Sequence, residues 1–158
     1  EIPLRLVGSE MCIRDRCSMI RIAIVDDIIE ICSSLERILL HYAEKIDEKI
    51  EVEPYTSSET FFSALDNNET FDLIYLDIEI DNKTGIDIAT HIRSVMDDEL
   101  QQIVYISGKP EYSIKLHETH PLDFIIKPIK QESVEKIMNR YMKISGRSKI
   151  KFAKADIF

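Results

Sequence analysis

The stretch Ile-Arg-Ile-Ala-Ile-Val-Asp-Asp, residues 20–27, decides the fold, because two adjacent carboxylates follow directly on a short apolar run. Short runs rich in Ile, Val and Tyr are typical of strands buried on both faces of a parallel sheet. Three further apolar runs each end at a polar residue: residues 73–76 at Asp77, residues 104–106 at Ser107, and residues 124–126 at Lys127. Because parallel strands all end at one edge of their sheet, we expect the carboxylates, the hydroxyl and the ammonium to converge on one shallow site.

Around these runs, strand-like and helix-like segments alternate five times from Met19 onward. The expected strands are residues 20–25, 49–55, 71–76, 102–106 and 122–126. The expected helices lie between and after them, at residues 28–46, 56–65, 86–95, 111–118 and 131–144. The longer ones have apolar residues spaced by three or four. This alternation predicts an α/β fold: a flavodoxin-like, doubly wound, five-stranded parallel sheet with the strand order 2-1-3-4-5 and five helices.

Two local patterns add detail to the expected helices. The second helix opens with Thr56-Ser-Ser-Glu59, which matches the pattern of a capping box. In the third helix, the spacing predicts that Ile92 and Val95 lie on the buried face.

The expected site lies where sheets of this kind bind ligands, beyond the carboxyl ends of the first and third strands. Asp26, Asp27 and Asp77 end those two strands. The adjacent acids could simply cap the next helix, but neighbouring carboxylates repel each other, and a divalent cation would offset that cost. Mg²⁺ prefers a few carboxylates, retained waters and phosphate oxygens. We therefore favour a magnesium site over a helix cap.

The strand ends also predict a site for a phosphoryl group. Asp77 could be a solvated loop acid, but an Asp carboxylate can attack phosphorus and form an acyl phosphate. Ser107 could be a turn residue, or a hydroxyl that donates to a phosphoryl oxygen. Lys127 could be a surface lysine, but it precedes Pro128, which restricts its backbone to an extended form. Its ammonium would then be a point charge for phosphate.

Composition excludes several classes of function. The chain has 158 residues, enough for one domain with a full core. Its net charge of −9 argues against DNA binding by this chain alone, because neutralising phosphates needs clustered Lys and Arg. No apolar run approaches the length of a membrane span. Cys12, Cys17 and Cys32 lack metal-ligand spacing, which indicates reduced, unpaired cysteines in a cytoplasmic protein.

The two ends of the chain look different from its middle. Residues 1–18 have no helical or strand period and lack the apolar region of a signal peptide. They resemble read-through of a sequencing adaptor, so we expect a disordered, non-native leader before a true start at Met19. We expect the folded domain at residues 19–142. Residues 143–158 are expected to be a linker and the start of a truncated output domain.

Residues 19–142 resemble the receiver domain of bacterial two-component response regulators. The resemblance rests on the polar residues at the strand ends and on their intervals: Asp26-Asp27 after the first strand, eight positions from Asp77 to Gly85, thirty from Asp77 to Ser107, and twenty from Ser107 to Lys127-Pro128.

The resemblance implies a role for each residue at the metal. Asp77 would be the phosphoacceptor, and Asp26 and Asp27 would bind Mg²⁺ together with it. The backbone carbonyl of Glu79 would complete the protein's contribution to the metal.

The resemblance also implies roles around the phosphoryl group. Ser107 and Lys127 would contact it, and the peptide bond from Lys127 to Pro128 would be cis. Phe124 would be the switch aromatic, at a position that often holds Tyr in the family, and Ser107 would move with it. Phe lacks the hydroxyl, so ring movement rather than a tyrosine hydrogen bond would carry the switch.

Within the family, the chain is similar to receivers joined to LytTR DNA-binding domains, the LytR/AgrA-like class. The similar stretches are residues 76–80, 84–93 and 107–113. This implies a sensor histidine kinase as partner, and a homodimer through the fourth helix, fifth strand and fifth helix. DNA would be contacted only through the output domain. The chain would catalyse its own phosphotransfer and autodephosphorylation rather than act as a turnover enzyme. A membrane is not among the expected partners.

Two other classes of function fit less well. An Mg²⁺-dependent phosphatase with an Asp nucleophile, such as a haloacid dehalogenase-like enzyme, has an Asp-x-Asp pair after its first strand. Here the acids are adjacent, and no cap insertion is evident. A flavodoxin-like flavin carrier would have a phosphate loop rich in Ser, Thr and Gly, where this chain has Asp-Asp-Ile-Ile-Glu at residues 26–30.

Overall fold

The computed structural model describes residues 19–147, except for the side chains of residues 113–115. The expectations for residues 1–18, and for an output domain after residue 147, lie outside the described residues. Within the described part, no helix is both long and apolar enough to cross a membrane.

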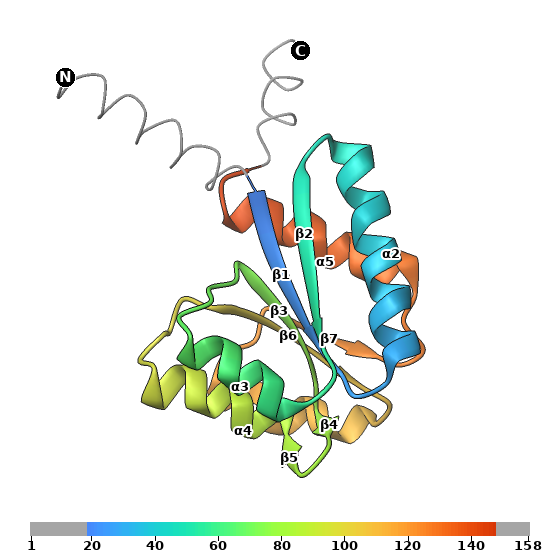
Figure 1. The fold of residues 1–158 in the computed structure, drawn as a ribbon. Helices are drawn as coiled ribbons and strands as arrows, with labels where there is room; N and C mark the ends of the chain where they lie inside the picture. The colour runs from blue at the N-terminus through green and yellow to red at the C-terminus, as the bar shows by residue number, and fades with distance from the viewer. Residues whose placement is uncertain (1–18, 148–158) are drawn as a thin grey trace, which may run out of the picture.

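Five parallel strands form the central sheet, in the order β2-β1-β3-β6-β7 (Figure 1). Their bounds are Met19–Val25 (β1), Lys49–Tyr55 (β2), Leu73–Asp77 (β3), Gln102–Ser107 (β6) and Asp123–Ile126 (β7). Counted along the chain within this sheet alone, the order is 2-1-3-4-5, so the predicted fold is confirmed. The order places the ends of β1 and β3 next to each other, with β6 on the other side of β3.

Helices cover both faces of the sheet (Figure 1). Helices α2 (Ile29–Ile46) and α5 (Gln131–Ile144) pack on one face, and α3 (Ser58–Asp66) and α4 (Gly85–Thr90) on the other. Successive side chains of a strand point to opposite faces. In β1, Ile22 and Ile24 therefore join the core under α2 and α5, whereas Ala23 joins the core under α3 and α4. Burial on both faces explains why residues 22–25 are all apolar.

The third and fourth helical segments differ from the predicted α-helices. Helix α4 continues as a π turn, His91–Val95, and the fourth segment, Pro110–Thr119, is a 3₁₀ helix. The described residues thus hold four α-helices rather than five. A π turn closes bonds between residues five apart, so a spacing of three no longer keeps one face buried. Val95 is therefore 70% exposed although Ile92 is buried, and its predicted burial is wrong.

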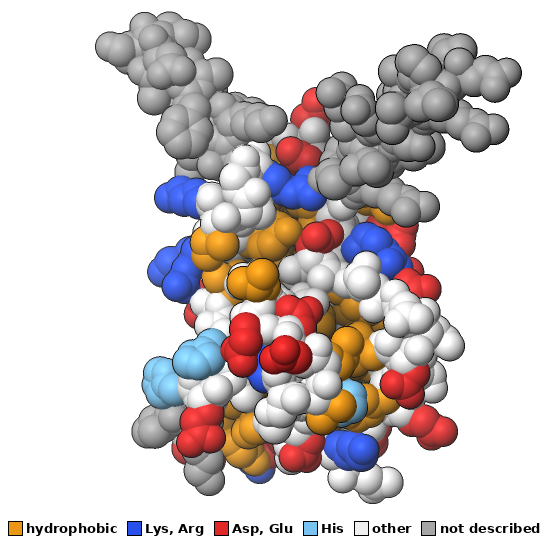
Figure 2. All heavy atoms as spheres, turned by 90° about the vertical axis from the view of Figure 1, so that its left-hand side faces the viewer, with side chains coloured by type: hydrophobic (Ala, Val, Ile, Leu, Met, Phe, Trp, Pro, Cys, Tyr) orange, Lys and Arg blue, Asp and Glu red, His pale blue; other side chains and the backbone are white. Residues whose placement is uncertain are grey.

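The side of the molecule at the left of Figure 1, near α3 and α4, faces the viewer in Figure 2. Hydrophobic side chains form small patches there, separated by acidic ones. Val95, Met96 and Leu100, which follow α4 in the chain, are among the exposed hydrophobic residues.

Two helix starts show how local bonds set the bounds. The N-cap of α3 is Ser57, whose Oγ accepts a hydrogen bond from the backbone N–H of Thr60 at 3.1 Å. The predicted box starting at Thr56 is therefore wrong by one residue. A capping box does form at α4, where Thr84 and Asp87 each bond the other's backbone N–H.

A short antiparallel hairpin follows β3, formed by β4 (Glu79–Ile80) and β5 (Lys83–Thr84). It was not predicted, because strands of two residues are too short to show an alternating pattern. The hairpin joins Asp77 to the start of α4 and carries Glu79 in its first strand.

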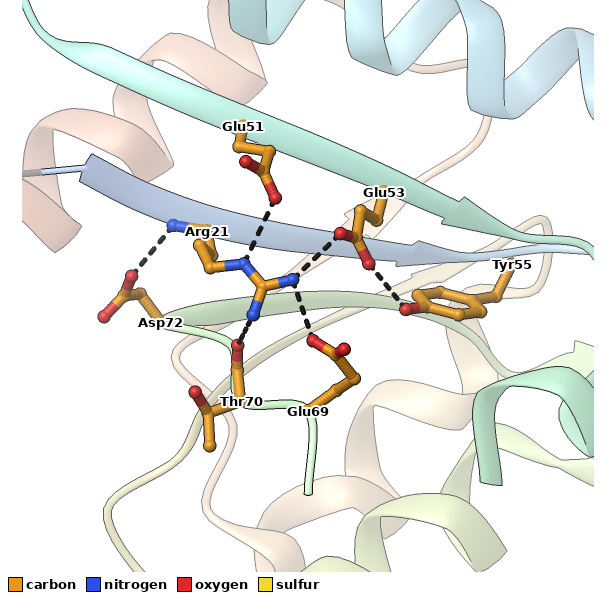
Figure 3. A network of polar contacts seen from close by, with 7 residues as sticks. All are labelled: Arg21, Glu51, Glu53, Tyr55, Glu69, Thr70 and Asp72. Atoms are coloured by element: carbon orange, nitrogen blue, oxygen red, sulfur yellow. Dashed lines mark hydrogen bonds and ion pairs between the residues drawn. The ribbon is translucent and has the colours of Figure 1, made fainter. Parts of the chain in front are cut away.

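Near the amino-terminal end of β1, Arg21 ties three segments together (Figure 3). Its guanidinium lies 3.2 Å from Glu51, 2.8 Å from Glu53 and 3.0 Å from Glu69, and it donates to the carbonyl of Thr70 at 3.0 Å. The backbone N–H of Arg21 donates to Asp72 at 2.8 Å. These contacts fasten the edge strand β2 and the segment before β3 to β1.

Candidate functional site

Three carboxylates meet where β1 and β3 end. Asp26 and Asp27 follow β1, and Asp77 is the last residue of β3. Each offers an oxygen atom, and these atoms all lie within 4.8 Å of one another. Asp26 and Asp77 are buried, whereas Asp27 is exposed. The convergence expected from the topology therefore occurs, and it leaves one carboxylate open to solvent.

Lys127 brings one positive charge to these acids from the end of β7. Its Nζ lies 3.2 Å from Oδ2 of Asp26 and 3.6 Å from Oδ2 of Asp77. Its backbone N–H donates to the carbonyl of Ser107 at 2.8 Å, which fixes the chain beside β6. The peptide bond from Lys127 to Pro128 is cis, so this prediction is confirmed.

Ser107 lies at the end of β6, the strand beside β3, and is buried. Its Oγ accepts a hydrogen bond from the backbone N–H of Lys109 at 3.0 Å. A serine hydroxyl that accepts one bond still has its own hydrogen to donate. The next residue, Gly108, has open space where a side chain would begin. The hydroxyl thus lies beside a part of the loop that leaves room for another group.

The buried acids are under electrostatic strain. Burial, and then the nearby Asp26 carboxylate, raise the pKa of Asp77 from 3.8 to about 6, although Lys127 acts in the opposite direction. Burial likewise raises the pKa of Asp26. Oδ1 of Asp26 accepts the backbone N–H of Ile28 at 2.9 Å. Oδ2 has the ion pair with Lys127 but no hydrogen-bond partner among the described residues.

This imbalance fits a small hard cation. Three carboxylates face one ammonium, and a buried oxygen without a hydrogen bond is costly. A divalent ion with oxygen ligands would satisfy that oxygen and offset the repulsion. The residues present therefore match the donor set that Mg²⁺ prefers.

Glu79 lies at the exposed rim of the site. Its backbone N–H donates to Oδ1 of Asp77 at 3.3 Å. Its side chain points elsewhere, since it pairs with Lys109 Nζ and accepts the Tyr112 hydroxyl at 3.2 Å. The side chain thus joins the loops that follow β3 and β6. Sequence reasoning missed Lys109 and Tyr112, because their contact depends on the path of a loop.

Phe124, the expected switch aromatic, lies on β7 and pairs in register with Tyr105 of β6. It is half-buried and packs against the core under α3 and α4. That core also contains Leu116 of the 3₁₀ segment, and the role of Phe124 as a switch stays a prediction.

Two small residues pack against the backbone of the acidic residues. A Cβ at Gly85 would overlap the carbonyl oxygen of Asp77, so only glycine fits there, and the interval from Asp77 had already singled this residue out. Cys32 is a buried free cysteine whose Sγ donates to the carbonyl of Asp26 at 3.3 Å. Burial raises the pKa of its thiol to about 11, which agrees with the predicted reduced, unpaired state. Cys12 and Cys17 lie outside the described residues.

The fold and this cluster of residues define a class of protein. Residues 22–139 match the family model of the response regulator receiver domain, and the chain belongs to that family. Receivers are signalling modules of two-component systems, and the family-level prediction is confirmed.

Relatives with similar sequences belong to the LytT and LytR group. The sensory transduction protein LytT of Bacillus subtilis (strain 168) is 25% identical over 127 residues, which cover 80% of this chain and 50% of LytT. LytR of Staphylococcus epidermidis is 32% identical over 113 residues, which cover 72% of this chain and 42% of LytR. The chain spans about half the length of these relatives.

Solved structures confirm the fold. The response regulatory domain of mrkE from Klebsiella pneumoniae superposes with a TM-score of 0.70 at 19% identity, covering 82% of this chain and 100% of that one. The response regulator TrrA from Thermotoga maritima, solved in complex with Mg²⁺-BeF, has a TM-score of 0.65 at 21% identity, covering 78% and 99%.

The raised pKa of Asp77 predicts how stability depends on pH without metal. The Asp77 carboxyl binds its proton more tightly in the folded state than in the unfolded state. The stabilisation of the fold by this protonated carboxyl is therefore fully present below about pH 4 and is lost as the pH rises through about 6. In EDTA at pH 7, Asp77→Asn should therefore raise the free energy of unfolding by about 1–3 kcal/mol. Urea unfolding of both proteins from pH 4 to 7.5 measures it. A difference that does not grow with pH would contradict the argument.

Proposed function

We propose that this receiver takes a phosphoryl group from a sensor histidine kinase onto Asp77. The observation that supports this most directly is the cluster itself: a buried carboxylate with raised pKa, two further acids and one lysine at the end of adjacent parallel strands. Asp26, Asp27 and Asp77 would hold Mg²⁺, with the backbone carbonyl of Glu79. The chemistry that Mg²⁺ supplies when bound is charge neutralisation at the phosphoryl oxygens.

The chain's own residues would carry out the transfer. A carboxylate oxygen of Asp77 attacks the phosphorus, a P–N bond to the kinase histidine breaks, and an acyl phosphate forms on the aspartate. Lys127 stabilises negative charge on the transferred group from the side of β7. Ser107 donates its hydroxyl to a phosphoryl oxygen. Each of these residues reaches the same edge of the sheet.

A first experiment tests this proposal with the small donor acetyl phosphate. Wild-type protein should gain one acid-stable, base-labile phosphate in the presence of Mg²⁺, and none in EDTA, as measured by intact mass. Asp27→Asn should weaken Mg²⁺ binding about tenfold or more and slow labelling, because one ligand oxygen loses its charge. Labelling that is equally fast in EDTA would contradict the magnesium part of the proposal.

The same proposal extends to the output. Phosphorylated Asp77 would draw the Ser107 hydroxyl away from the Lys109 backbone, and Phe124 would turn into the space released. The face formed by the 3₁₀ segment, β7 and α5 would then change and favour a homodimer. In the parent protein this would switch a LytTR-type DNA-binding domain, as the similarity to LytT and LytR suggests. Only an element with two states that bind the phosphoryl group differently can transmit such a signal.

The switch has its own test. Adding beryllofluoride and Mg²⁺, a phosphoryl mimic, should increase the mass measured by sedimentation and shift the amide signals of residues 110–144. The expected coupling is about 1–3 kcal/mol, which is roughly a 5- to 150-fold change in dimer affinity. If the mimic binds but neither signal changes, the switch proposal fails while the phosphoacceptor role stands.

A further inference from the structure

We propose that Asp81 is a positioning residue for the metal site: it clamps the β4–β5 hairpin onto helix α3 and so fixes the backbone of Glu79 beside the carboxylates. This inference rests on the proposed function, because it concerns the carbonyl of Glu79 as a metal ligand. It assigns a role to a residue outside the acidic cluster.

The clamp is formed at the turn of the hairpin. The carboxylate of Asp81 accepts the backbone N–H of Ser58 at 2.7 Å and the hydroxyl of Ser58 at 2.8 Å. It also accepts the backbone N–H of Lys83 at 3.2 Å, within the turn. Ser58 is the buried first residue of α3 and lies 23 positions earlier in the chain. One side chain thus joins the hairpin to a helix on the core.

The base of the hairpin is fixed as well. The backbone N–H of Gly85 donates to the carbonyl of Ile78 at 2.8 Å, and Ile80 is buried in the core under α3 and α4. Glu79 lies between these two points. Its own N–H donates to Asp77, while its side chain contacts Lys109 and Tyr112 on the loop after β6 rather than the hairpin. The position of its backbone therefore depends on the hairpin being held at both ends.

A purely structural reading of the same contacts is that Asp81 stabilises the start of α3. The first N–H groups of a helix lack intrahelical partners, and a negative charge suits that end. However, Ser57 already caps α3 through Thr60. The two readings differ in what they predict for Mg²⁺, because an octahedral ion tolerates little displacement of a ligand. Mutation of a residue that orients a metal ligand typically lowers metal affinity 10- to 100-fold.

The experiment measures Mg²⁺ affinity and unfolding free energy for the same set of variants of the whole chain. Asp81→Asn keeps the size and tolerates the left-handed backbone found at this turn (φ 33°). Ser58→Ala removes only the hydroxyl donor, and Ser58→Thr restores it. The matched control is Asp98→Asn, because Asp98 also accepts backbone N–H groups, from Leu100 and Gln101, in the loop that leads into β6.

We expect Asp81→Asn to weaken Mg²⁺ binding about tenfold, Ser58→Ala to weaken it less, and Ser58→Thr to recover it. The hairpin amides should exchange faster in Asp81→Asn, and Asp98→Asn should bind Mg²⁺ as wild type does. Wild-type affinity in Asp81→Asn, or an equal loss in Asp98→Asn, would overturn the positioning role while leaving the proposed function intact. Absence of Mg²⁺ binding by the wild type would instead overturn the proposed function and this inference with it.

Discussion

The Asp77→Asn variant should take up no phosphate from acetyl phosphate and Mg²⁺, a loss of at least about a hundredfold in labelling rate. The amide cannot act as the nucleophile that forms an acyl phosphate, and Asp77 is the carboxylate whose strand pairs with the end of β6, next to Ser107. Intact mass and hydroxylamine sensitivity measure the product. The loss would not reflect unfolding, because the same substitution should stabilise the metal-free protein.

A matched control separates this effect from a general loss of charge. Asp66 lies exposed at the end of α3 and is not a member of the acidic cluster, so Asp66→Asn should be labelled as wild type is. If Asp77→Asn is labelled at the wild-type rate, the phosphoacceptor lies elsewhere, and Asp26 and Asp27 become the next residues to test.

The second large effect concerns stability at a residue that sequence reasoning did not single out. Arg93 is only 7% exposed, and its guanidinium donates to three backbone carbonyls: Thr119 at 3.0 Å, Asp98 at 2.8 Å and His120 at 3.4 Å. Two of these carbonyls end the 3₁₀ segment. Arg93→Met keeps the apolar stem but leaves the carbonyls unpaired, so we expect the free energy of unfolding to fall by about 3–5 kcal/mol.

Urea unfolding of Arg93→Met and Arg140→Met tests this expectation. Arg140 also donates to a backbone carbonyl, that of Leu122 at 2.9 Å, but its side chain is 58% exposed. Arg140→Met should therefore lower the free energy of unfolding by no more than about 1 kcal/mol. Equal losses for the two variants would show that burial of Arg93 adds nothing to its hydrogen bonds.

The strands and the meeting of the acids could be predicted because both follow from simple rules. The run at residues 73–76 is apolar throughout, which identifies a strand buried on both faces. The topology then brings Asp77 beside Asp26 without further information. The cis bond before Pro128 could be inferred only from the family resemblance, since the sequence alone favours trans.

The rest could not be predicted because it depends on tertiary contacts. The sequence at the π turn that exposes Val95 has the same spacing of apolar residues as an α-helix would. The N-cap of α3 is Ser57 rather than the predicted Thr56, although both residue types are suitable caps. The bonds from Ser58 to Asp81, and from Arg93 to the end of the 3₁₀ segment, join residues more than twenty positions apart and have no signal in a single sequence.

Arg21 pairs with three carboxylates and Lys127 with two, at opposite ends of the sheet, yet only the cluster around Lys127 is a candidate site. At Arg21 the acids are 36–44% exposed, so water screens their mutual repulsion and nothing further is needed. At Lys127 the paired acids Asp26 and Asp77 are at most 4% exposed, and water cannot do the same. In the language of energy landscapes, the first cluster is minimally frustrated, whereas the second keeps a local frustration that a ligand relieves. The number of charges in a sequence therefore does not distinguish a binding site from a structural salt-bridge network. The dielectric environment of the charges makes that distinction.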